Sequence, residues 1–430
     1  MPSAGVAGRL RSGISWSLAG AVANSGLNLG MNVVLARMLG RAGFGEFAIV
    51  QSTMVTVAGV VQLATGYTAN KYIAEFHGVD RDRTARIIGF CTIVSVFTAT
   101  IGLLVMIAGA SWLAVHGLNK PQLQWSLMAA SGMVFFFVLN GFQLGVLAGL
   151  ESFRQIARGI AWGAVGMTAA CVTGAWLDGA HGAAACLSVG AMLQWLAVRH
   201  AMRAELAARE ITPVYHELAR EKRIFLHFAL PAALTGFIST PAIWIANSFL
   251  IRQPNGVEEM ALFAAANSLR SLVLFLPQLL NRVTTTLLNT ERGRGDGAGY
   301  RQVFRVNLAS STLIALAASV GVAVLGPWLL KAFGKTFGGA YPVLLLLLLA
   351  AVVEVVFQAV YQLVQSNEKM WHSLLVVVVP RDGAIALLAL LFAPKFGVAG
   401  LAGSYAIAWC LGLVFVSTLA RRTRLLPSAT

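Results

Sequence analysis

Long stretches of apolar residues with almost no charge dominate this chain. The stretches 341–365 and 398–420 together contain a single charged residue, Glu354. A helix needs about 20 apolar residues to cross the hydrocarbon core of a bilayer, so each stretch is long enough for one crossing. The strands of a membrane barrel would alternate apolar and polar residues, so the unbroken runs predict helices instead. The sequence therefore predicts an all-α membrane protein that crosses the bilayer many times.

The composition excludes a soluble protein of this length. Charged residues make up 11% of the 430 residues and hydrophobic residues 57%, whereas soluble domains carry about 25% and about 45–50%. This amount of charge is too small to cover a surface that faces water. The formal net charge of +15 would suggest nucleic-acid binding in a soluble protein, but Lys and Arg also accumulate in the cytoplasmic loops of membrane proteins. We therefore expect no nucleic-acid partner.

Charged and turn residues divide the apolar runs into twelve predicted spans. Their approximate ranges are 14–36, 44–66, 87–110, 125–148, 159–177, 183–199, 226–250, 260–281, 304–329, 341–365, 372–393 and 398–420. The most charged stretch of the chain, residues 199–223, separates the sixth span from the seventh. We therefore expect an N-terminal six-helix lobe over 1–200, a cytoplasmic linker over 201–224 and a C-terminal six-helix lobe over 225–430.

The basic residues are distributed unevenly between the two sides of these spans. With the N-terminus in the cytoplasm, 22 of the 32 Lys and Arg residues fall in cytoplasmic segments and 7 on the opposite side. The remaining three, Arg270, Arg282 and Arg381, lie at or near membrane depth. Because cytoplasmic loops collect Lys and Arg, this bias predicts that both termini are cytoplasmic.

A shift of about 215 residues aligns the two halves of the chain. It places Asn32 on Asn247, and with a small slip it places Gly179 near Gly397. Six spans return the chain to the side on which it started, so both halves have the same topology. We therefore expect two parallel six-helix repeats, related by an axis along the membrane normal, that enclose a central cavity.

Four sequence motifs carry a family resemblance that extends over about residues 10–420. They are Leu35-Ala-Arg-Met-Leu-Gly-Arg-Ala-Gly-Phe-Gly-Glu-Phe-Ala48, Gly149-Leu-Glu-Ser-Phe-Arg154, Trp328-Leu-Leu-Lys-Ala-Phe-Gly-Lys-Thr-Phe337 and Phe396-Gly-Val-Ala-Gly-Leu-Ala402. In these motifs the chain resembles the Wzx-type oligosaccharide flippases of polysaccharide biosynthesis. Their superfamily also includes the multidrug-extrusion antiporters and the lipid II flippase. Twelve spans are fewer than lipid II flippases usually have.

The resemblance implies a specific activity and location. A flippase of this family moves an undecaprenyl-diphosphate-linked oligosaccharide across the bacterial inner membrane by alternating access. The product supplies a surface polysaccharide such as O-antigen or exopolysaccharide. Its partners would be the lipid-linked oligosaccharide, membrane lipids and possible polysaccharide assembly machinery, with H⁺ or Na⁺ as open choices for a coupling ion.

Two arginines are the main candidates for contact with such a substrate. Arg270 lies ten residues into the eighth span, about 15 Å along the helix axis. Charge at this depth usually faces a wet cavity or an opposite charge. A guanidinium suits bidentate contact with a diphosphate, and the alternative is an arginine paired with Glu354. Arg381 is the second candidate, in the Pro380-Arg-Asp-Gly383 segment that we expect to interrupt the eleventh span.

Two carboxylates are candidates for ion coupling. Glu354 lies deep in the tenth span and Asp382 follows Arg381. Successive side chains on a helix point about 100° apart, so Arg381 and Asp382 are not expected to form a simple pair. The alternatives are an arginine partner for Glu354 and a shallow loop around Asp382.

Amide side chains are candidates for binding sugar hydroxyls. Asn24, Asn28 and Asn32 follow one another at four-residue steps along one face of the first helix. Asn247 in the seventh span is the corresponding candidate in the second half. Hydrogen bonding between helices is the alternative for such amides.

The chain shows no arrangement typical of an enzyme or a metal site. Its four cysteines lie in apolar runs and its seven histidines are scattered, so we expect no catalytic residues, metal or cofactor. A cation-coupled multidrug exporter is the main alternative to the flippase, and it would favour a cavity rich in carboxylates. A membrane-embedded glycosyltransferase or polymerase is the less favoured alternative, because the predicted external loops are only about a dozen residues long.

Overall fold

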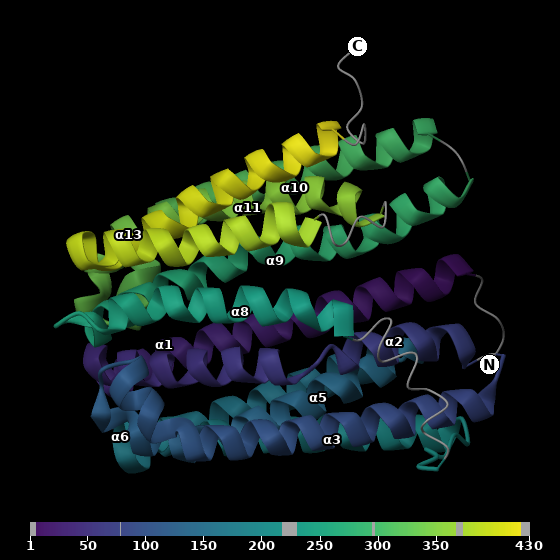
Figure 1. The fold of residues 1–430 in the computed structure, drawn as a ribbon, viewed down its shortest axis with the longest axis horizontal. Helices are drawn as coiled ribbons and strands as arrows, with labels where there is room; N and C mark the ends of the chain where they lie inside the picture. The colour runs from purple at the N-terminus through teal and green to yellow at the C-terminus, as the bar shows by residue number, and fades with distance from the viewer. Residues whose placement is uncertain (1–5, 78, 217–229, 295–296, 367–372, 423–430) are drawn as a thin grey trace. The chain divides into compact units, whose positions relative to one another are not determined.

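The computed structural model describes residues 6–77, 79–216, 230–294, 297–366 and 373–422. Every regular element within these residues is helical (Figure 1). The first helices are α1 (Val6–Val61), α2 (Thr65–Phe76), α3 (Arg81–Trp112), α4 (Gln124–Ala130), α5 (Gly132–Gly149) and α6 (Phe153–Ala208). They are followed by α8 (Leu230–Ile251), α9 (Gly256–Arg294), α10 (Gly297–Phe333), α11 (Tyr341–Ser366) and α13 (Val379–Arg422). The predicted all-α fold class is confirmed.

Short irregular helices connect several of these elements. The π-helical turn η1 (Leu113–Gly117) and the 3₁₀ turn η2 (Pro121–Leu123) lie between α3 and α4, and the 3₁₀ helix η5 (Lys335–Ala340) lies between α10 and α11. A second π-helical turn, η6 (Leu374–Val378), directly precedes α13. Such turns allow long apolar helices to reverse direction or change register without a long polar loop.

Three of the long helices contain a break in the backbone. The breaks lie at Gly40 in α1, at Asp178 and Gly179 in α6, and at Gly397 in α13. Eight helical stretches of the described residues are long and apolar enough to cross a membrane, and 237–251 is a shorter apolar helix. If each break separates two crossings, the described helices provide the twelve predicted spans. The chain is a multi-pass membrane protein.

The breaks at Gly179 and Gly397 have almost the same geometry. Their φ and ψ angles are 54° and −135° at Gly179, and 56° and −136° at Gly397. This region of φ and ψ is accessible essentially only to glycine. Since the sequence shift aligns these two positions, the matching backbone supports the predicted internal repeat.

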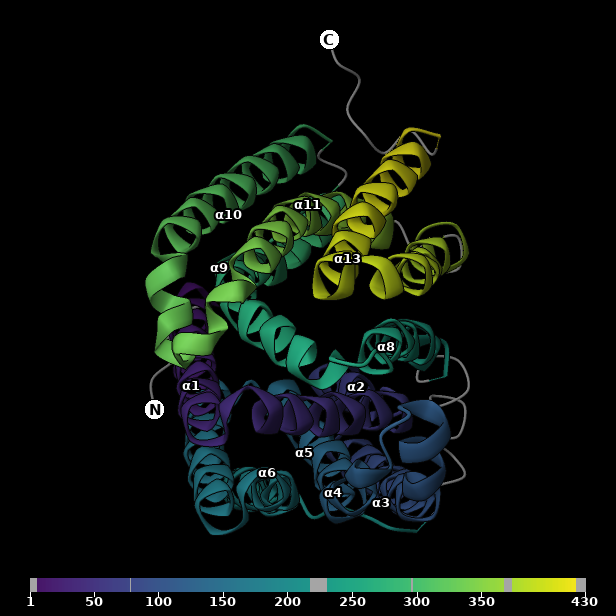
Figure 2. The same ribbon diagram turned by 90° about the vertical axis from the view of Figure 1, so that its left-hand side faces the viewer.

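The chain divides into two compact units, which we describe separately. Unit 1 comprises Met1–Leu39 and Glu46–Pro241, and unit 2 comprises Gly40–Gly45 and Ala242–Thr430. The division at Pro241 lies inside α8, where proline removes one helical hydrogen bond. Within unit 1, α5 packs against α2, α3 and α6; within unit 2, α9, α10 and α11 pack side by side (Figure 2).

The short segment Gly40–Gly45 forms part of the core of unit 2. Phe44 is 1% exposed, and its ring centroid lies 6.3 Å from that of Phe333 and 6.0 Å from that of Phe337. A Cβ at Gly45 would lie 2.0 Å from the carbonyl oxygen of Val257, so only glycine fits there. Aromatic packing and this close approach explain the placement of the segment.

The predicted linker 201–224 is described as far as residue 216. Its first part continues α6 to Ala208, and the following residues leave the helix and return to the start of α3. The guanidinium of Arg81 donates to the carbonyl of Arg209 at 2.6 Å, and the Val214 amide donates to the carbonyl of Ala85 at 3.1 Å. The described part of the linker is therefore attached to unit 1, while the boundary at 201–224 stays a prediction.

Candidate functional site

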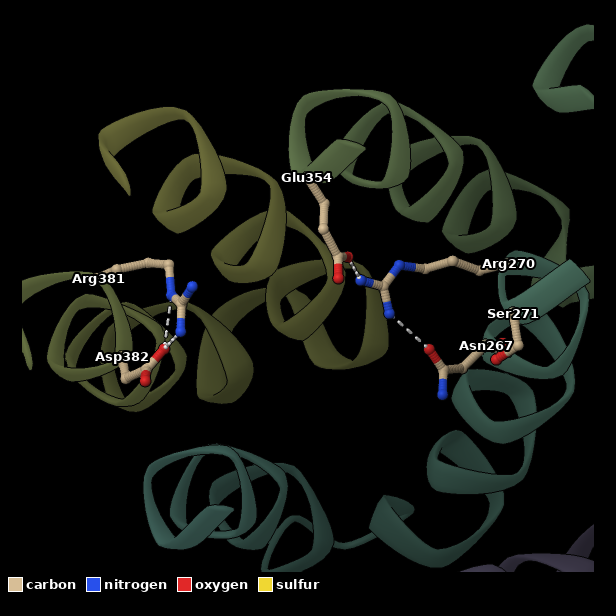
Figure 3. Close-up of polar contacts among 6 residues, drawn as sticks. All are labelled: Asn267, Arg270, Ser271, Glu354, Arg381 and Asp382. Atoms are coloured by element: carbon tan, nitrogen blue, oxygen red, sulfur yellow. Dashed lines mark hydrogen bonds and ion pairs between the residues drawn. The ribbon is translucent and has the colours of Figure 1, made fainter. Parts of the chain in front are cut away.

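The two arginines and two carboxylates predicted for the site lie in one buried cluster inside unit 2. Arg270 is on α9, Glu354 on α11, and Arg381 with Asp382 near the start of α13 (Figure 3). Each is less than 10% exposed. The charges of both arginines act on Glu354. The cluster carries two positive and two negative groups, so it is balanced in formal charge.

Arg270 is paired with Glu354. Its guanidinium donates through Nη2 to the Glu354 carboxylate, and Nη1 donates to Oδ1 of Asn267 at 3.0 Å. Nε of Arg270 is buried and has no hydrogen-bond partner within the described residues. The structure thus shows the pairing that the sequence offered as the alternative for Arg270. A contact between Arg270 and substrate stays a prediction, and the free Nε leaves one donor for it.

Arg381 is paired with its neighbour Asp382, and the prediction that they would not pair is wrong. Nε and Nη2 of Arg381 both lie 2.7 Å from Oδ1 of Asp382. The Cα–Cβ directions do diverge on a helix, but the long arginine side chain folds back to reach the carboxylate. Asp382 is only 1% exposed, so little water competes for either charge.

Aromatic rings hold the guanidinium of Arg381 in place. Its central carbon lies 4.4 Å from the ring centroid of Trp409 and 5.1 Å from that of Phe357. Gly412 leaves the space for the side chain, because a Cβ there would lie 2.9 Å from Cδ of Arg381. Cation–π contacts of this kind are strongest where the cation is shielded from water.

The expected interruption at Pro380 is also wrong. Pro380 is the second residue of α13, and the helix continues without a break through Gly383 as far as Gly397. The helical backbone runs from the π-helical turn η6 through Val379 into α13, so the proline lies inside a continuous helix that changes its hydrogen-bond pattern just before it. The irregular backbone precedes the proline, in the π-helical turn η6. The alternative of a shallow loop is excluded by the burial of Arg381 and Asp382.

Asn247 lies beside the same cluster through a tyrosine that the sequence analysis missed. The hydroxyl of Tyr405 on α13 donates to Oδ1 of Asn247 on α8 at 3.3 Å, and both residues are buried. The charges of Arg270, Glu354 and Asp382 all act on Tyr405. A buried tyrosine hydroxyl needs a partner, so a tyrosine within an apolar span is itself a signal for a polar site.

A second polar network in unit 2 was also missed. Asn307 donates to Oδ1 of Asn281 at 3.2 Å and accepts from Thr284 at 2.9 Å and Ser311 at 3.2 Å. All four side chains are buried. The hydroxyls and amides satisfy one another between α9 and α10, which is how polar groups commonly join helices inside a bilayer.

The asparagine stripe of α1 lies in unit 1. Nδ2 of Asn32 donates to Oδ1 of Asn28 at 3.2 Å, which joins two members of the stripe along one helix. Asn24 and Asn28 are exposed, whereas Asn32 is 8% exposed. The stripe therefore presents two accessible amides on one face, and its contact with sugar stays a prediction.

Comparison with known protein families supports the sequence analysis. The family model described as "Polysaccharide biosynthesis protein" matches residues 10–288. No curated protein sequence matches the chain.

Three solved transporter structures share the fold at low sequence identity. An inward-facing multidrug resistance MATE family transporter of the MOP superfamily matches at TM-score 0.70 and 15% identity, over 95% of this chain and 96% of its own. The lipid II flippase MurJ in an inward closed conformation matches at TM-score 0.75 and 12% identity, over 95% and 87%. A MOP superfamily transporter from Pyrococcus furiosus, described with a binding pocket of reverse polarity, matches at TM-score 0.68 and 16% identity, over 96% and 95%.

Proposed function

The chain belongs to the polysaccharide biosynthesis protein family, and we propose that it flips an undecaprenyl-diphosphate-linked oligosaccharide across the bacterial inner membrane. The fold is the one seen in solved transporter and flippase structures. The observation that carries the proposal is the buried Arg270–Glu354 pair on two long apolar helices. Burial of an arginine in a bilayer costs free energy. An arginine whose carboxylate partner can be replaced by a substrate group would bind substrate as well as stabilise the fold.

The proposed step is an exchange of partners at Arg270. Phosphate oxygens of the substrate take the place of the Glu354 carboxylate, because the planar guanidinium forms paired hydrogen bonds with either group. Glu354 would then be a buried carboxylate without its cation, which is costly unless it takes up a proton. Entry of the anionic substrate would thus be coupled to H⁺ at Glu354.

The other predicted residues support this step. Arg381 stays with Asp382 and adds positive potential near Glu354, since its charge acts on that carboxylate. The amides of Asn24, Asn28, Asn32 and Asn247 are proposed to bind sugar hydroxyls. The basic loops are proposed to hold both termini in the cytoplasm, and polysaccharide assembly machinery is the proposed recipient of the product.

Cation-coupled multidrug export is the less favoured function for the same cluster of charged residues. A carboxylate that binds Na⁺ or a cationic drug must be free of other positive partners. Glu354 and Asp382 are each neutralised by an arginine. This pairing favours an anionic substrate, which competes with the carboxylates for the guanidinium groups.

A pair of variants separates the substrate role of Arg270 from its structural role. Arg270→Met leaves Glu354 unpaired, and removal of one partner from a buried pair costs about 3–5 kcal/mol of stability. Arg270→Met combined with Glu354→Leu removes both charges and should restore most of that stability. We expect the double variant to insert and fold but not to flip undecaprenyl-diphosphate-linked oligosaccharide in proteoliposomes.

Gly403→Ala is the matched control, because a Cβ at Gly403 would meet no atom within 4 Å. It should fold and transport like the wild type. Transport at the wild-type rate by the Arg270/Glu354 double variant would remove Arg270 from the substrate path.

A further inference from the structure

Three buried polar groups on α5 and α6 make no hydrogen bond within the described part of the chain. They are Oδ1 of Asn140 and Oε1 of Gln143, both on α5, and the indole N–H of Trp195 on α6. Asn140 is 6% exposed and Gln143 3%. Buried side-chain amides and indoles are nearly always paired, so three such groups require an explanation.

The three groups share one helix interface. Phe136, Asn140, Gln143 and Leu147 follow at helical spacing along a single face of α5. At one end of this face the ring of Phe136 lies 5.5 Å from that of Trp195, and at the other end Leu147 belongs to one buried cluster with Val198 and Ala201 of α6. Asn140 and Gln143 therefore face α6 between these two contacts, on the same side of α5 as the Trp195 indole.

The rest of the chain shows that buried amides can be satisfied internally. In unit 2, Asn307 and Asn281 bond to each other, and Thr284 completes the network. Oδ1 of Asn140 and Oε1 of Gln143 accept no such bond within the described residues, although an unsatisfied buried acceptor is destabilising. A ligand that hydrogen-bonds to these groups would remove that cost.

The chemistry of the three groups selects the ligand. The unpaired atoms are two acceptor oxygens and one N–H donor, and the guanidinium of Arg199, which lies 4.8 Å from the centre of the Trp195 ring, disfavours a metal cation. A hydroxyl group both donates and accepts, and so satisfies the two kinds of group at once. The apolar faces of Phe136 and Trp195 suit the C–H face of a sugar ring.

We propose that this α5–α6 interface is a subsite for the neutral sugar hydroxyls of the transported oligosaccharide. The proposal rests on the proposed function and concerns contacts within unit 1 alone. Water carries the same hydroxyl chemistry, so the experiment must distinguish a sugar from a buried water.

Binding of three probes tests the subsite. The probes are undecaprenyl diphosphate, the same lipid carrying a neutral trisaccharide, and the free trisaccharide. We expect the wild type to bind the glycosylated lipid about thirtyfold more tightly than the bare lipid, as three added hydrogen bonds of about threefold each would give. The Asn140→Leu, Gln143→Leu double variant should lower this preference about tenfold, with its affinity for the bare lipid unchanged.

Trp195→Phe provides a second test that keeps the aromatic volume and removes only the donor. It should reduce the preference for the glycosylated lipid about threefold, for the loss of one hydrogen bond. If the amide double variant does not fold, Trp195→Phe alone tests the proposal. An unchanged preference for the glycosylated lipid over the bare lipid then overturns it.

The outcomes separate the subsite from the function on which it rests. A sugar preference that the amide double variant leaves unchanged means that the groups bind only water, and it overturns the subsite alone. If neither lipid binds the wild type but the free trisaccharide does, and the double variant abolishes that binding, the flippase function fails and the subsite stands. If no probe binds, both fail.

Discussion

Individual side chains in unit 2 show how charge is carried inside an apolar helix bundle. Arg270 is neutralised across helices by Glu354, whereas Arg381 is neutralised within its own helix by Asp382 and covered by Trp409. The first pair joins two helices, and the exchange proposed for an anionic substrate would open it. The Arg381–Asp382 pair is formed by adjacent residues and is covered by aromatic rings, so its two side chains are less free to separate.

Gly412 should control the position of Arg381. In Gly412→Val, the new side chain would occupy the space of Cδ and Cγ of Arg381, which lie 2.9 and 3.0 Å from an ideal Cβ. The guanidinium would move away from Asp382 and Trp409. We expect a loss of about 1–3 kcal/mol in the free energy of unfolding in detergent, the usual cost of overpacking.

Gly403→Val is the control for this substitution. It lies on the same helix and carries the same cost of a β-branched residue, but no atom lies within 4 Å of its ideal Cβ. Equal destabilisation of the two variants would show that Arg381 is not held by the space at Gly412.

The sequence could identify the charged residues of the site but not their partners. Arg270, Glu354, Arg381 and Asp382 stand out because charge is rare in apolar spans. The pairing of Arg381 with Asp382 was missed because a helical wheel represents each side chain by a direction and ignores its length. Aromatic residues such as Trp409 were missed because, in a sequence, a residue that covers a guanidinium looks the same as one in the core.

At the scale of elements, glycines mark where long helices turn. The apolar runs predicted the boundaries at Gly179 and Gly397 because turn residues interrupt the hydrophobic pattern there. The same reasoning failed at Pro380, since a π-helical turn can accommodate a proline without ending the helix. Local composition alone does not distinguish the two cases, which depend on the π-helical turn η6 before it.

The two matching glycines allow backbone strain to be separated from a steric clash. Gly179→Ala introduces strain alone, because a Cβ there meets no atom within 4 Å. Gly397→Ala adds a contact of 2.6 Å with the Glu259 carboxylate to the same strain. Strained backbone of this kind costs about 1–3 kcal/mol, so we expect that loss for Gly179→Ala and a larger one for Gly397→Ala.

Thermal unfolding of both variants in the same detergent measures the difference. Gly179→Ala and Gly397→Ala serve as controls for each other, because the backbone angles at the two sites agree within a few degrees. A Gly397→Ala variant that is as stable as Gly179→Ala would mean that the Glu259 carboxylate moves aside freely.

At the scale of the whole molecule, hydrophobicity and basic charge carry most of the predictive information. The number of spans follows from the lengths of the apolar runs, and the predicted orientation follows from the positions of Lys and Arg. The division of the chain inside α8 at Pro241, and the inclusion of Gly40–Gly45 in unit 2, could not be predicted in this way. Both depend on packing between residues distant in sequence, such as Phe44 with Phe333.

The predicted orientation can be tested with single cysteines placed at exposed basic residues. Arg158 precedes the fifth span and is expected in the cytoplasm, whereas Lys395 precedes the twelfth and is expected on the opposite side; both are exposed. In a background without the four native cysteines, a membrane-impermeant maleimide should label Lys395→Cys in intact spheroplasts. It should label Arg158→Cys only after lysis, because the bilayer separates that site from the reagent. The reverse pattern would place the basic loops outside, and a substrate loaded in the cytoplasm would then meet the wrong end of the transporter.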